Sequence, residues 1–456
     1  MIIREIKTSL NSFEIYLAFK DDEYSYFLDS GMNNGGLGKY SFVGSNPFKV
    51  FKSKNGEIEV VTGSESDKKT GNPFKELKDL YLKYQMDYKI DLPFIGGMVG
   101  YFAYDLCHHV EKIARTAVDD VNIPDLYLGF YDGAIVIDHE NNKVYATDAG
   151  IRPGGEARIL CLEDHIRVFE NNPVVLNIPR HDTEAVFTSN FEKEEFKSSI
   201  TKVREFIRSG DIYQANMTQR FTTPLRDNPL HLYKKLRDIN PAPFASFMDF
   251  GEGHIVSSSP ERFLSLRDGV IETRPIKGTL PRGKNDEEDA INRELLQNSE
   301  KDRSELLMIV DLERNDLSKI AKVASVVVPE HFAIETYATV FHLVSTVRAQ
   351  VLDGLTPIDC IEATFPGGSI TGAPKIRAME VIDELEPTQR NLYTGSIGYI
   401  GFNGEMDLNI VIRTILCKED TAYFQVGGGI VWDSKEESEY NETLDKARAL
   451  MNALRH

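Results

Sequence analysis

Short runs that alternate apolar and polar residues dominate the first 180 positions, and this pattern predicts β-strands with one buried face. Clear examples lie at 48–51, 58–61 and 134–138, with turn residues at 55–56 and 140–142. A helix is predicted at 74–84, where leucines recur at 77, 80 and 82. We therefore expect a strand-rich N-terminal region with few helices.

After residue 190, helical and strand patterns mix without strict alternation, so a parallel, doubly wound sheet is not expected. Helical spacing predicts helices at 191–209, 230–239, 286–310, 375–385 and 435–454. Strand patterns lie at 212–221, 244–250, 254–258, 262–267, 270–274, 396–402, 408–416 and 421–426. Two prolines and several polar residues at 172–190 predict a surface crossover between the halves.

The composition is that of a folded protein, with 456 residues, 41% hydrophobic and 27% charged. This length suits one large domain or a few smaller ones. The net charge of -19 makes nucleic acid an unfavourable main partner and does not attract the chain to anionic membranes. No apolar run reaches the ~18 residues of a membrane span, and the N-terminus lacks the apolar core of a signal peptide. The four cysteines lack C-x-x-C spacing, so reduced thiols and a cytoplasmic location are expected.

Lys277 and Glu261 offer an amine and a carboxylate in segments that proline and glycine keep out of helix interiors. Lys277 lies in Pro-Ile-Lys-Gly-Thr (275–279), and Glu261 lies in Ser-Pro-Glu-Arg (259–262). A lysine that loses its proton in a dry site is a nucleophile, and a nearby carboxylate can move protons. A lone lysine after a strand is more often a solvated charge, so the pair gains weight only from the motifs that follow.

Two acidic pairs with i,i+3 spacing lie on predicted helices: Asp302 with Glu305, and Glu439 with Glu442. This spacing places both carboxylates of a pair on one helix face. Two such helices could hold a hard cation such as Mg²⁺, which uses one or two carboxylates plus waters and substrate oxygens. Solvated helix faces, with Glu442 paired to Lys446, are the simpler explanation for each pair alone.

Two glycine-rich segments could bring backbone N–H groups close to an anion. One spans 365–375 and leads into a helix, without the Gly-Lys-Ser/Thr ending of a nucleotide-phosphate loop. The other, Gly427-Gly428-Gly429, follows a predicted strand. A tight turn explains either segment equally well.

Three single residues interrupt predicted apolar strands. Arg413 would need an acidic partner if it were buried, and a place on the solvent face explains it equally well. His342 and Tyr399 have the same ambiguity, because a satisfied core residue is the more common role for a lone histidine or tyrosine on such a strand.

Taken together, and in this order, the motifs resemble those of the chorismate-utilising enzymes: anthranilate synthase component I, aminodeoxychorismate synthase component I, isochorismate synthase and salicylate synthase. They are Ser-Pro-Glu (259–261), Arg-Pro-Ile-Lys-Gly-Thr (274–279), Lys-Asp-Arg-x-Glu (301–305), Val-Asp-Leu-x-Arg-Asn-Asp (310–316), Phe-Pro-Gly-Gly-Ser-Ile-Thr-Gly-Ala-Pro-Lys (365–375), Ile-Arg-Thr (412–414), Gly-Gly-Gly-Ile (427–430) and Glu-Tyr-x-Glu-Thr-x-x-Lys (439–446).

The resemblance implies an α+β fold of one large domain, in which two antiparallel β-sheets pack together with helices outside. Residues 190–456 would form the chorismate-binding catalytic region. Residues 1–180 would be the family's N-terminal region within the same globule. The active site would lie deep between the sheets.

The lysine at 277 discriminates within the family, because anthranilate synthases carry a sequence like Pro-Ile-Ala-Gly-Thr at this place. Pro-Ile-Lys-Gly-Thr resembles the signature of aminodeoxychorismate synthases. The resemblance thus implies a transaminase-type transferase that converts chorismate and ammonia to 4-amino-4-deoxychorismate, on the route to p-aminobenzoate and folate. Anthranilate synthase component I is the runner-up. A catalytically silent regulatory subunit and an isochorismate synthase that uses water are further alternatives.

The same resemblance implies roles for individual residues. Lys277 would attack ring atom C2, Glu261 would protonate the leaving C4 hydroxyl, and His342 would orient or exchange protons near the ring carboxylate. Mg²⁺ would be held by Glu305 and Glu442, with Glu439 and Asp302 as further ligands or supporting groups. Substrate contacts would come from Arg413, Tyr399, Gly428, Gly429, Lys446, Thr279, Thr371, Gly372 and Ala373.

Two further ligands or partners are implied. No cysteine lies in a Gly-x-Cys-x-Gly elbow, so a separate glutamine amidotransferase subunit would deliver the ammonia. Two segments resemble the tryptophan pocket of related enzymes, which makes tryptophan a candidate ligand. Their residues are Leu28, Asp29 and Ser30 in one segment, and Pro241 and Phe244 in the other.

Overall fold

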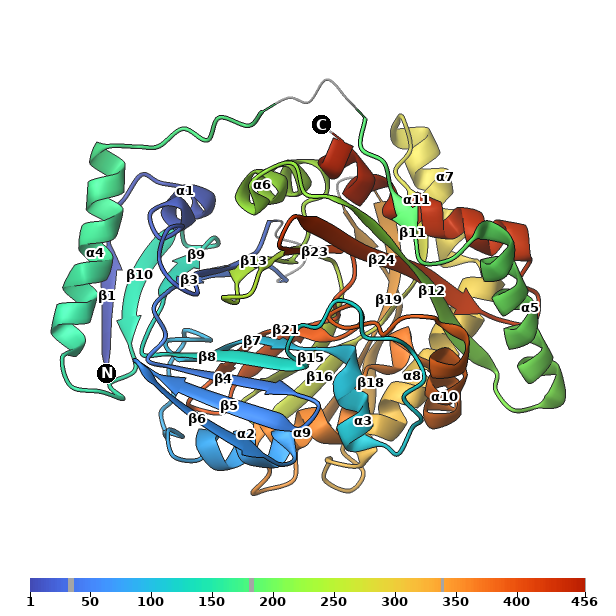
Figure 1. Ribbon diagram of the computed structural model, residues 1–456, viewed down its shortest axis with the longest axis horizontal. Coiled ribbons are helices and arrows are strands. Elements are labelled where there is room, and N and C mark those ends of the chain that lie inside the picture. Colours follow the sequence, from blue (N-terminus) through green and yellow to red (C-terminus); the bar gives the residue numbers. More distant parts are fainter. Residues whose placement is uncertain (32–36, 180–183, 338–339, 456) are drawn as a thin grey trace.

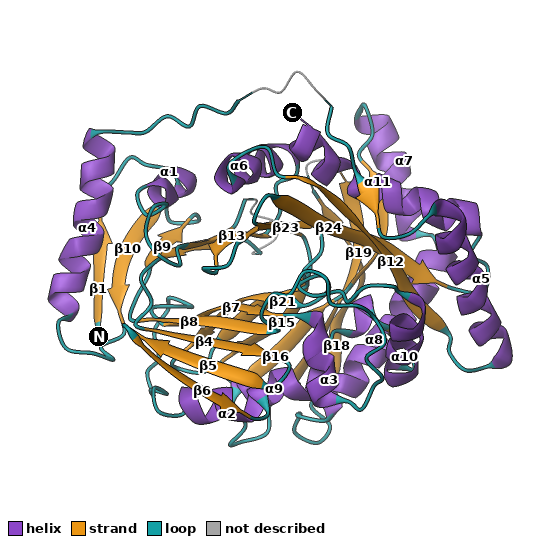
Figure 2. Ribbon diagram, in the orientation of Figure 1, coloured by secondary structure: helices purple, strands orange, loops and turns teal. Residues whose placement is uncertain are grey.

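Two antiparallel sheets face each other, with helices on their outer sides (Figures 1 and 2). The computed structural model describes residues 1–31, 37–179, 184–337 and 340–455. Each sheet has twelve strands within these ranges. The predicted α+β class with two antiparallel sheets is confirmed, and a parallel doubly wound sheet is excluded for the described chain.

The first sheet joins both ends of the chain. Its order is β1 (Ile2–Ile6), β10 (Lys143–Asp148), β9 (Ile135–Asp138), β3 (Tyr40–Gly44), β2 (Tyr26–Asp29), β13 (Phe244–Asp249), β14 (His254–Ser259), β23 (Thr414–Lys418), β24 (Thr421–Ile430), β12 (Gln214–Pro224) and β11 (Thr188–Ser189), with β20 (Gly372–Ala373) also paired to β12.

The second sheet likewise mixes early and late strands. Its order is β17 (Ile276–Pro281), β19 (Val340–Gln350), β16 (Val270–Arg274), β15 (Arg262–Arg267), β22 (Met406–Asn409), β21 (Ser396–Gly401), β7 (Gly97–Phe102), β8 (Leu126–Tyr131), β4 (Lys49–Lys54), β5 (Glu57–Thr62) and β6 (Glu65–Thr70), with β18 (Val327–Thr336) also paired to β19.

The helices cover the outer faces of the sheets and the ends of the molecule (Figure 1). They are α1 (Ser12–Leu17), α2 (Pro73–Tyr81), α3 (Cys107–Val110), α4 (Gly155–Asn171), α5 (Lys193–Ser209), α6 (Pro229–Ile239), α7 (Asp286–Gln297), α8 (Glu300–Ser318), α9 (Pro357–Thr364), α10 (Lys375–Leu385) and α11 (Glu436–Arg455), with 3-10 turns η1 (Tyr104–Leu106) and η2 (Gly368–Ile370). No described helix is long and apolar enough to cross a membrane.

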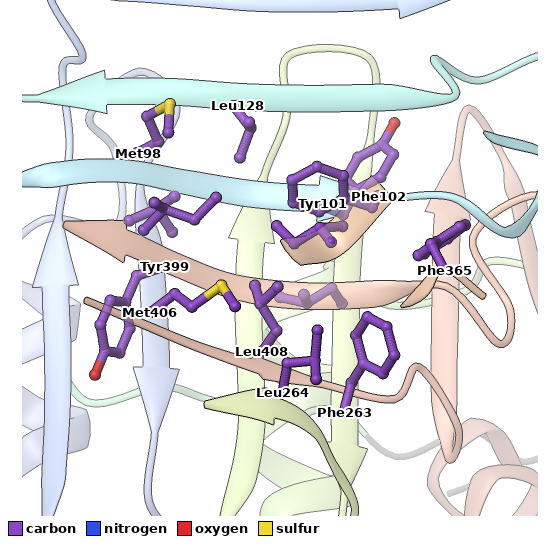
Figure 3. Close-up of a cluster of buried hydrophobic side chains, with 14 of the residues drawn as sticks. Met98, Tyr101, Phe102, Leu128, Phe263, Leu264, Phe365, Tyr399, Met406 and Leu408 are labelled. Atoms are coloured by element: carbon purple, nitrogen blue, oxygen red, sulfur yellow. The ribbon is translucent and has the colours of Figure 1, made fainter. Parts of the chain in front are cut away.

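Apolar side chains from both sheets form the largest buried cluster. Figure 3 shows part of it, where aromatic and aliphatic residues of β7, β15, β21 and β22 interleave. Phe263 on β15 packs edge-on against Phe365, which follows α9, with ring centroids 6.1 Å apart. A second cluster lies between the first sheet and α1, α4, α6 and α11. These two clusters fix the central strands of both sheets in place.

The predicted long helix at 286–310 is wrong in one respect, because α7 and α8 replace it. Ser299 interrupts the helix: its side chain accepts the Asp302 N–H and caps α8. Asn298 closes α7 just before this cap. Serine favours such caps over helix interiors because its hydroxyl competes for backbone groups. The break sets the start of α8, on which the first acidic pair lies.

The predicted strand at 408–416 is also wrong, because it is divided between the two sheets. Its first part belongs to β22 in the second sheet, and its last part to β23 in the first. Arg413 lies between them with a φ of +53°, so it is not in a strand. The chain therefore crosses from one sheet to the other at this residue.

Most other predicted elements agree with the structure within a few residues. The hairpin at 262–274 turns at Asp268 and Gly269, which both have positive φ. Gly427, Gly428 and Gly429 lie inside β24 and not after it, because the strand runs on to Ile430. The predicted crossover at 172–190 includes residues 180–183, which lie outside the described residues. Its described residues before β11 form no helix or strand.

Candidate active site

Lys277 lies on β17 at a bulge. The pairing of β17 with β19 shifts register between Lys277 and Thr279. Gly278 has a φ of +77°, which glycine adopts at little cost. A Cβ at this position would lie 2.9 Å from Cγ of Asp302, so the bulge packs directly against the first turn of α8. The bulge thereby brings Lys277 beside the acidic face of that helix.

The Lys277 amine is surrounded by ionisable groups from three other segments. Burial lowers its pKa below the ordinary value, and the carboxylates of Glu305, Glu261 and Glu442 partly oppose this effect. The ammonium of Lys446 adds to the lowering. An amine in this setting loses its proton more readily than a surface lysine does. The structure therefore brings the predicted nucleophile and three predicted carboxylates together.

Glu261 lies at the junction of β14 and β15 and is only 5% exposed. Its Oε1 accepts a hydrogen bond of 2.6 Å from the Ser369 hydroxyl. Burial raises the pKa of Glu261 to about 7, although Ser369 and Lys277 pull it downward. A carboxyl group with this pKa can both hold and release a proton near neutral pH.

The two acidic pairs face the same space from α8 and α11. Glu305 and Glu442 each act electrostatically on Lys277 and on each other. Burial raises the pKa of Glu305, and the negative charges of Asp302 and Glu442 raise it further. Burial alone would also raise the pKa of Glu442, but its ion pair of 2.7 Å with Lys446 lowers it.

Gly428 on β24 leaves an open place beside the second acidic pair. A Cβ there would lie 3.4 Å from both Glu442 Oε1 and Lys446 Nζ, and 3.7 Å from Glu439 Oε2. Lys446 also donates to the Gly427 carbonyl at 2.9 Å. The carboxylate oxygens of Glu442 and Glu439 suit a hard cation, since Mg²⁺ needs only one or two carboxylates together with other oxygen ligands. Within the described chain, no three His, Cys, Asp or Glu side chains form a metal cluster by themselves.

The glycine-rich segment at 365–375 is separated from Gly427, Gly428 and Gly429 by one strand, β12. Thr371, Gly372 and Ala373 run along the start of β12, and β24 runs along its other side. Gly372 faces Ala215, which faces Ile430 next to Gly429. The hydroxyl of Thr371 is buried and donates to the Gly367 carbonyl at 3.0 Å. The strand pairing thus brings 371–373 near the end of β24, as the motifs imply.

Arg413 faces the same centre from the crossing between the sheets. Burial lowers its pKa, and the groups that oppose this are Tyr393, Glu442 and Glu261. Arg413 has a positive φ, and its backbone carbonyl accepts the Ser258 N–H at 3.1 Å. The hydrogen bond attaches the crossing segment to the end of β14. A cation in this place can receive a carboxylate of a small ligand.

Tyr399 does not belong to this cluster, which corrects its predicted place. Its ring packs 4.9 Å from the Phe94 ring and 5.2 Å from the Phe42 ring, and it lines a different cavity. Tyr393 takes the corresponding position beside Arg413, and burial raises the pKa of Tyr393 to about 12. Sequence reasoning missed Tyr393 and Ser369, although both lie within or near motifs already singled out.

His342 lies on β19 and is 8% exposed. Its Nδ1 shares a hydrogen bond of 2.8 Å with the Thr279 hydroxyl, across the strand pair from the bulge. Burial lowers the pKa of His342 to about 4, so the imidazole is neutral at pH 7. A neutral ring beside Thr279 can orient a ligand or exchange a proton, and it adds no charge to the site.

A separate cavity of about 240 Å³ lies between β2, β13, β15 and β21–β22. Leu28, Asp29, Ser30 and Phe244 line it, as their motif resemblance implies. Pro241 is not among its lining residues, and Pro243 lines it instead. Arg262 also lines this cavity and follows Glu261 directly in the chain.

The comparisons with known proteins agree with this site. The family model for chorismate binding enzymes matches residues 20–452. Aminodeoxychorismate synthase component 1 of Klebsiella aerogenes is 44% identical over 80% of this chain and 78% of its own length. Anthranilate synthase component 1 of Acetivibrio thermocellus is 37% identical over 96% of this chain and 92% of its own.

A solved structure shows the same likeness in three dimensions. Anthranilate synthase component I from Streptococcus pneumoniae superposes with a TM-score of 0.80 and 33% identity, covering 91% of this chain and 92% of that one. With the family model spanning nearly the whole chain and the motif residues gathered around Lys277, this protein belongs to the family of chorismate binding enzymes.

Proposed function

We propose that the protein is an aminodeoxychorismate synthase component I, which converts chorismate and ammonia to 4-amino-4-deoxychorismate. The observation that carries the proposal is the half-buried amine of Lys277, whose pKa is lowered, in the same centre as the Glu261 carboxyl group, whose pKa is about 7. Relatives with this name are 38–44% identical to the chain. Anthranilate synthase is the second candidate, because relatives with that name align over more of the chain.

The proposed reaction proceeds in two displacements. Neutral Lys277 Nζ bonds to ring atom C2, both ring double bonds shift toward C4, and the C4–O bond breaks. Glu261 gives its proton to the leaving oxygen, which departs as water. Ammonia then bonds to C4, both double bonds shift back, the bond between C2 and Lys277 breaks, and the new C4 ammonium returns a proton to Glu261. Two easier steps replace one difficult displacement, which is the usual benefit of covalent catalysis.

The chain's own charges suit the two carboxylates of chorismate. Arg413, with Tyr393 beside it, supports binding of the enolpyruvyl carboxylate. The carboxylates of Glu305 and Glu442 would hold Mg²⁺, which would neutralise the ring carboxylate and withdraw electron density from the ring. The negative charge of Glu442 raises the pKa of Glu305, which supports a cation between them, although Lys277, Lys301 and Lys446 already offset part of this charge.

Ammonia delivery by a glutamine amidotransferase partner is part of the proposal. Of the four cysteines, only Cys161 is exposed, and it lies on the outer helix α4. Nothing near Lys277 supplies a cysteine nucleophile for glutamine hydrolysis. Free ammonium at high concentration should therefore replace the partner in vitro.

The cavity lined by Leu28, Asp29, Ser30 and Phe244 is proposed to bind tryptophan. It combines aromatic walls with buried polar groups, as sites for small amphipathic ligands do. Calorimetric titration with tryptophan tests this. Saturable binding that Ser30→Trp abolishes would support it, and no heat with protein that still turns over chorismate would contradict it.

Product analysis tests the main proposal. Purified protein receives chorismate, Mg²⁺ and ammonium, and mass spectrometry identifies the product. Aminodeoxychorismate is expected, and anthranilate as the sole product would replace the proposal by the second candidate.

A further inference from the structure

Glu313 is a buried carboxylate that the proposed mechanism does not use. It lies on α8, about two turns beyond Glu305, and is 3% exposed. Its Oε1 accepts the N–H of Gly368 at 3.1 Å, and no other hydrogen bond to it is found within the described chain. Burying a carboxylate is costly unless other groups compensate for it. Its position therefore calls for an explanation.

The Gly368 turn connects Glu313 to the catalytic carboxyl group. Gly368 begins the turn η2, and the next residue, Ser369, donates its hydroxyl proton to Glu261 at 2.6 Å. The third residue, Ile370, accepts from Arg390 at 3.1 Å. Two buried carboxylates thus hold consecutive residues of one turn.

The turn packs closely on α8, so its position depends on that helix. A Cβ on Gly368 would lie 2.8 Å from Leu312 Cδ2 and 3.1 Å from Glu313 Oε1. The start of the segment is held separately, because Lys375 donates to the carbonyls of Thr364 and Pro366 at 2.8 and 2.7 Å. The hydrogen bond from Gly368 to Glu313 holds the residue before Ser369, while Asn216 Nδ2 donates to the Ser369 carbonyl at 3.0 Å.

We propose that Glu313 is a positioning residue for Glu261. Its carboxylate fixes Gly368, which holds the Ser369 hydroxyl against Glu261, and its negative charge makes Glu261 retain its proton more strongly. This inference deepens the proposed function and rests on the role of Glu261 as the acid for the C4 hydroxyl.

The charged groups around Glu313 come from three elements. Asp316 lies on the same helix, Lys375 on α10, and Glu261 at the start of β15. Burial, Asp316 and Glu261 together raise the pKa of Glu313 to about 7, while Lys375 and the Gly368 N–H oppose them. Each carboxylate, once ionised, makes the other harder to ionise.

The groups around Glu261 predict opposite effects for two substitutions. Lys277, Arg413 and the Ile276 N–H favour the Glu261 anion, as does the Ser369 hydroxyl. Removing that hydroxyl should raise the pKa of Glu261. Removing the negative charge of Glu313 should lower it. If Glu313 and Ser369 only supported the fold, their removal would not shift the pKa of Glu261 in opposite directions.

The test is the pH dependence of kcat for Glu313→Gln and Ser369→Ala, with saturating chorismate, Mg²⁺ and ammonium. Activity falls at high pH as Glu261 loses its proton. We expect this fall to move by about half a pH unit or more to lower pH in Glu313→Gln, and to higher pH in Ser369→Ala.

In Glu313→Gln the side chain keeps an oxygen that accepts the Gly368 N–H. Glu313→Leu loses it, so its kcat should drop about tenfold at every pH with little change in KM for chorismate.

Asp311→Asn is the matched control, because Asp311 is exposed on the same helix and forms an ion pair with Arg314. It should reproduce the wild-type profile. An unmoved profile in Glu313→Gln, or a shift of Glu313→Gln and Ser369→Ala in the same direction, would overturn the inference. If Glu313→Leu does not fold, the pH profile of Glu313→Gln alone tests the inference. Failure of the proposed function would look different: wild-type protein would make no aminodeoxychorismate at any pH.

Discussion

At the scale of single residues, the chemistry depends on two groups with opposite requirements. Lys277 must be neutral to attack the ring, and burial lowers its pKa in that direction. Glu261 must be protonated to release the hydroxyl, and burial raises its pKa to about 7. Activity should therefore rise with pH as Lys277 loses its proton and fall above pH 7 as Glu261 loses its own.

Lys277→Ala tests the amine directly. We expect aminodeoxychorismate formation to fall roughly 100-fold or more, because the covalent route is lost. Some anthranilate chemistry should remain or appear, because the rest of the site is kept. Chromatography of the products from chorismate and ammonium measures both. Lys284→Ala, an exposed neighbour in the chain, is the control; unchanged turnover in Lys277→Ala would remove the covalent role.

Glu261→Gln should separate activity from stability. The folded protein raises the pKa of this carboxyl from 4.5 to about 7. A raised carboxyl pKa favours folding at low pH, and the advantage is lost as pH rises between these values. The variant should lose most activity and, at pH 9, be more stable than wild type by up to about 3 kcal/mol. Denaturant titration at pH 4 and 9 measures this, and equal stabilities at both would contradict the buried, ionised carboxylate.

At the scale of elements, the site depends on the packing of β17 against α8 and on the proximity of the acidic residues of α8 to those of α11. None of these pairings is local, so strand and helix patterns alone do not predict them. The hairpin at 262–274 was predictable, because its turn residues identify it. The break at Ser299 was not recognised, because the apolar pattern continues across it. Sequence reasoning selected Tyr399, which lies within β21, and not Tyr393, which lies in the turn before this strand; only the fold shows that Tyr393 is the tyrosine beside Arg413.

Gly278→Ala tests the bulge on β17. The positive φ would strain the alanine, and its Cβ would clash with Asp302. We expect a loss of about 1 kcal/mol or more in the free energy of unfolding, and a lower kcat because Lys277 is displaced. Gly269→Ala is a matched control, because Gly269 has a similar φ of +75° with no atom near its Cβ. Equal kcat in the two variants would show that the bulge does not position Lys277.

Glu305→Gln and Glu442→Gln test the meeting of α8 and α11. Each should raise the Mg²⁺ concentration needed for half-maximal activity by about tenfold or more, since a hard cation prefers a charged oxygen to an amide. Asp445→Asn on α11, where the Asp445 side chain is 65% exposed, should leave the Mg²⁺ titration unchanged. An unaltered titration in both glutamine variants would exclude these glutamates as ligands.

At the scale of the whole molecule, both sheets combine strands from the two ends of the sequence. β2 pairs with β13, and β7 pairs with β21. These pairings join residues that lie hundreds of positions apart in the sequence. The local periodicity of apolar residues therefore could not predict the two-sheet architecture, which was expected only from the motif resemblance. The resulting frame holds the catalytic centre and the cavity lined by Arg262 within one pair of sheets, with Glu261 and Arg262 adjacent in the chain.

The most direct measurement is the product that the purified protein forms from chorismate, ammonium and Mg²⁺ without any partner, identified by mass spectrometry. Formation of 4-amino-4-deoxychorismate, which a lyase then converts to p-aminobenzoate, is the predicted result. Anthranilate as the only product, or isochorismate formed without ammonium, would contradict the proposed role of Lys277.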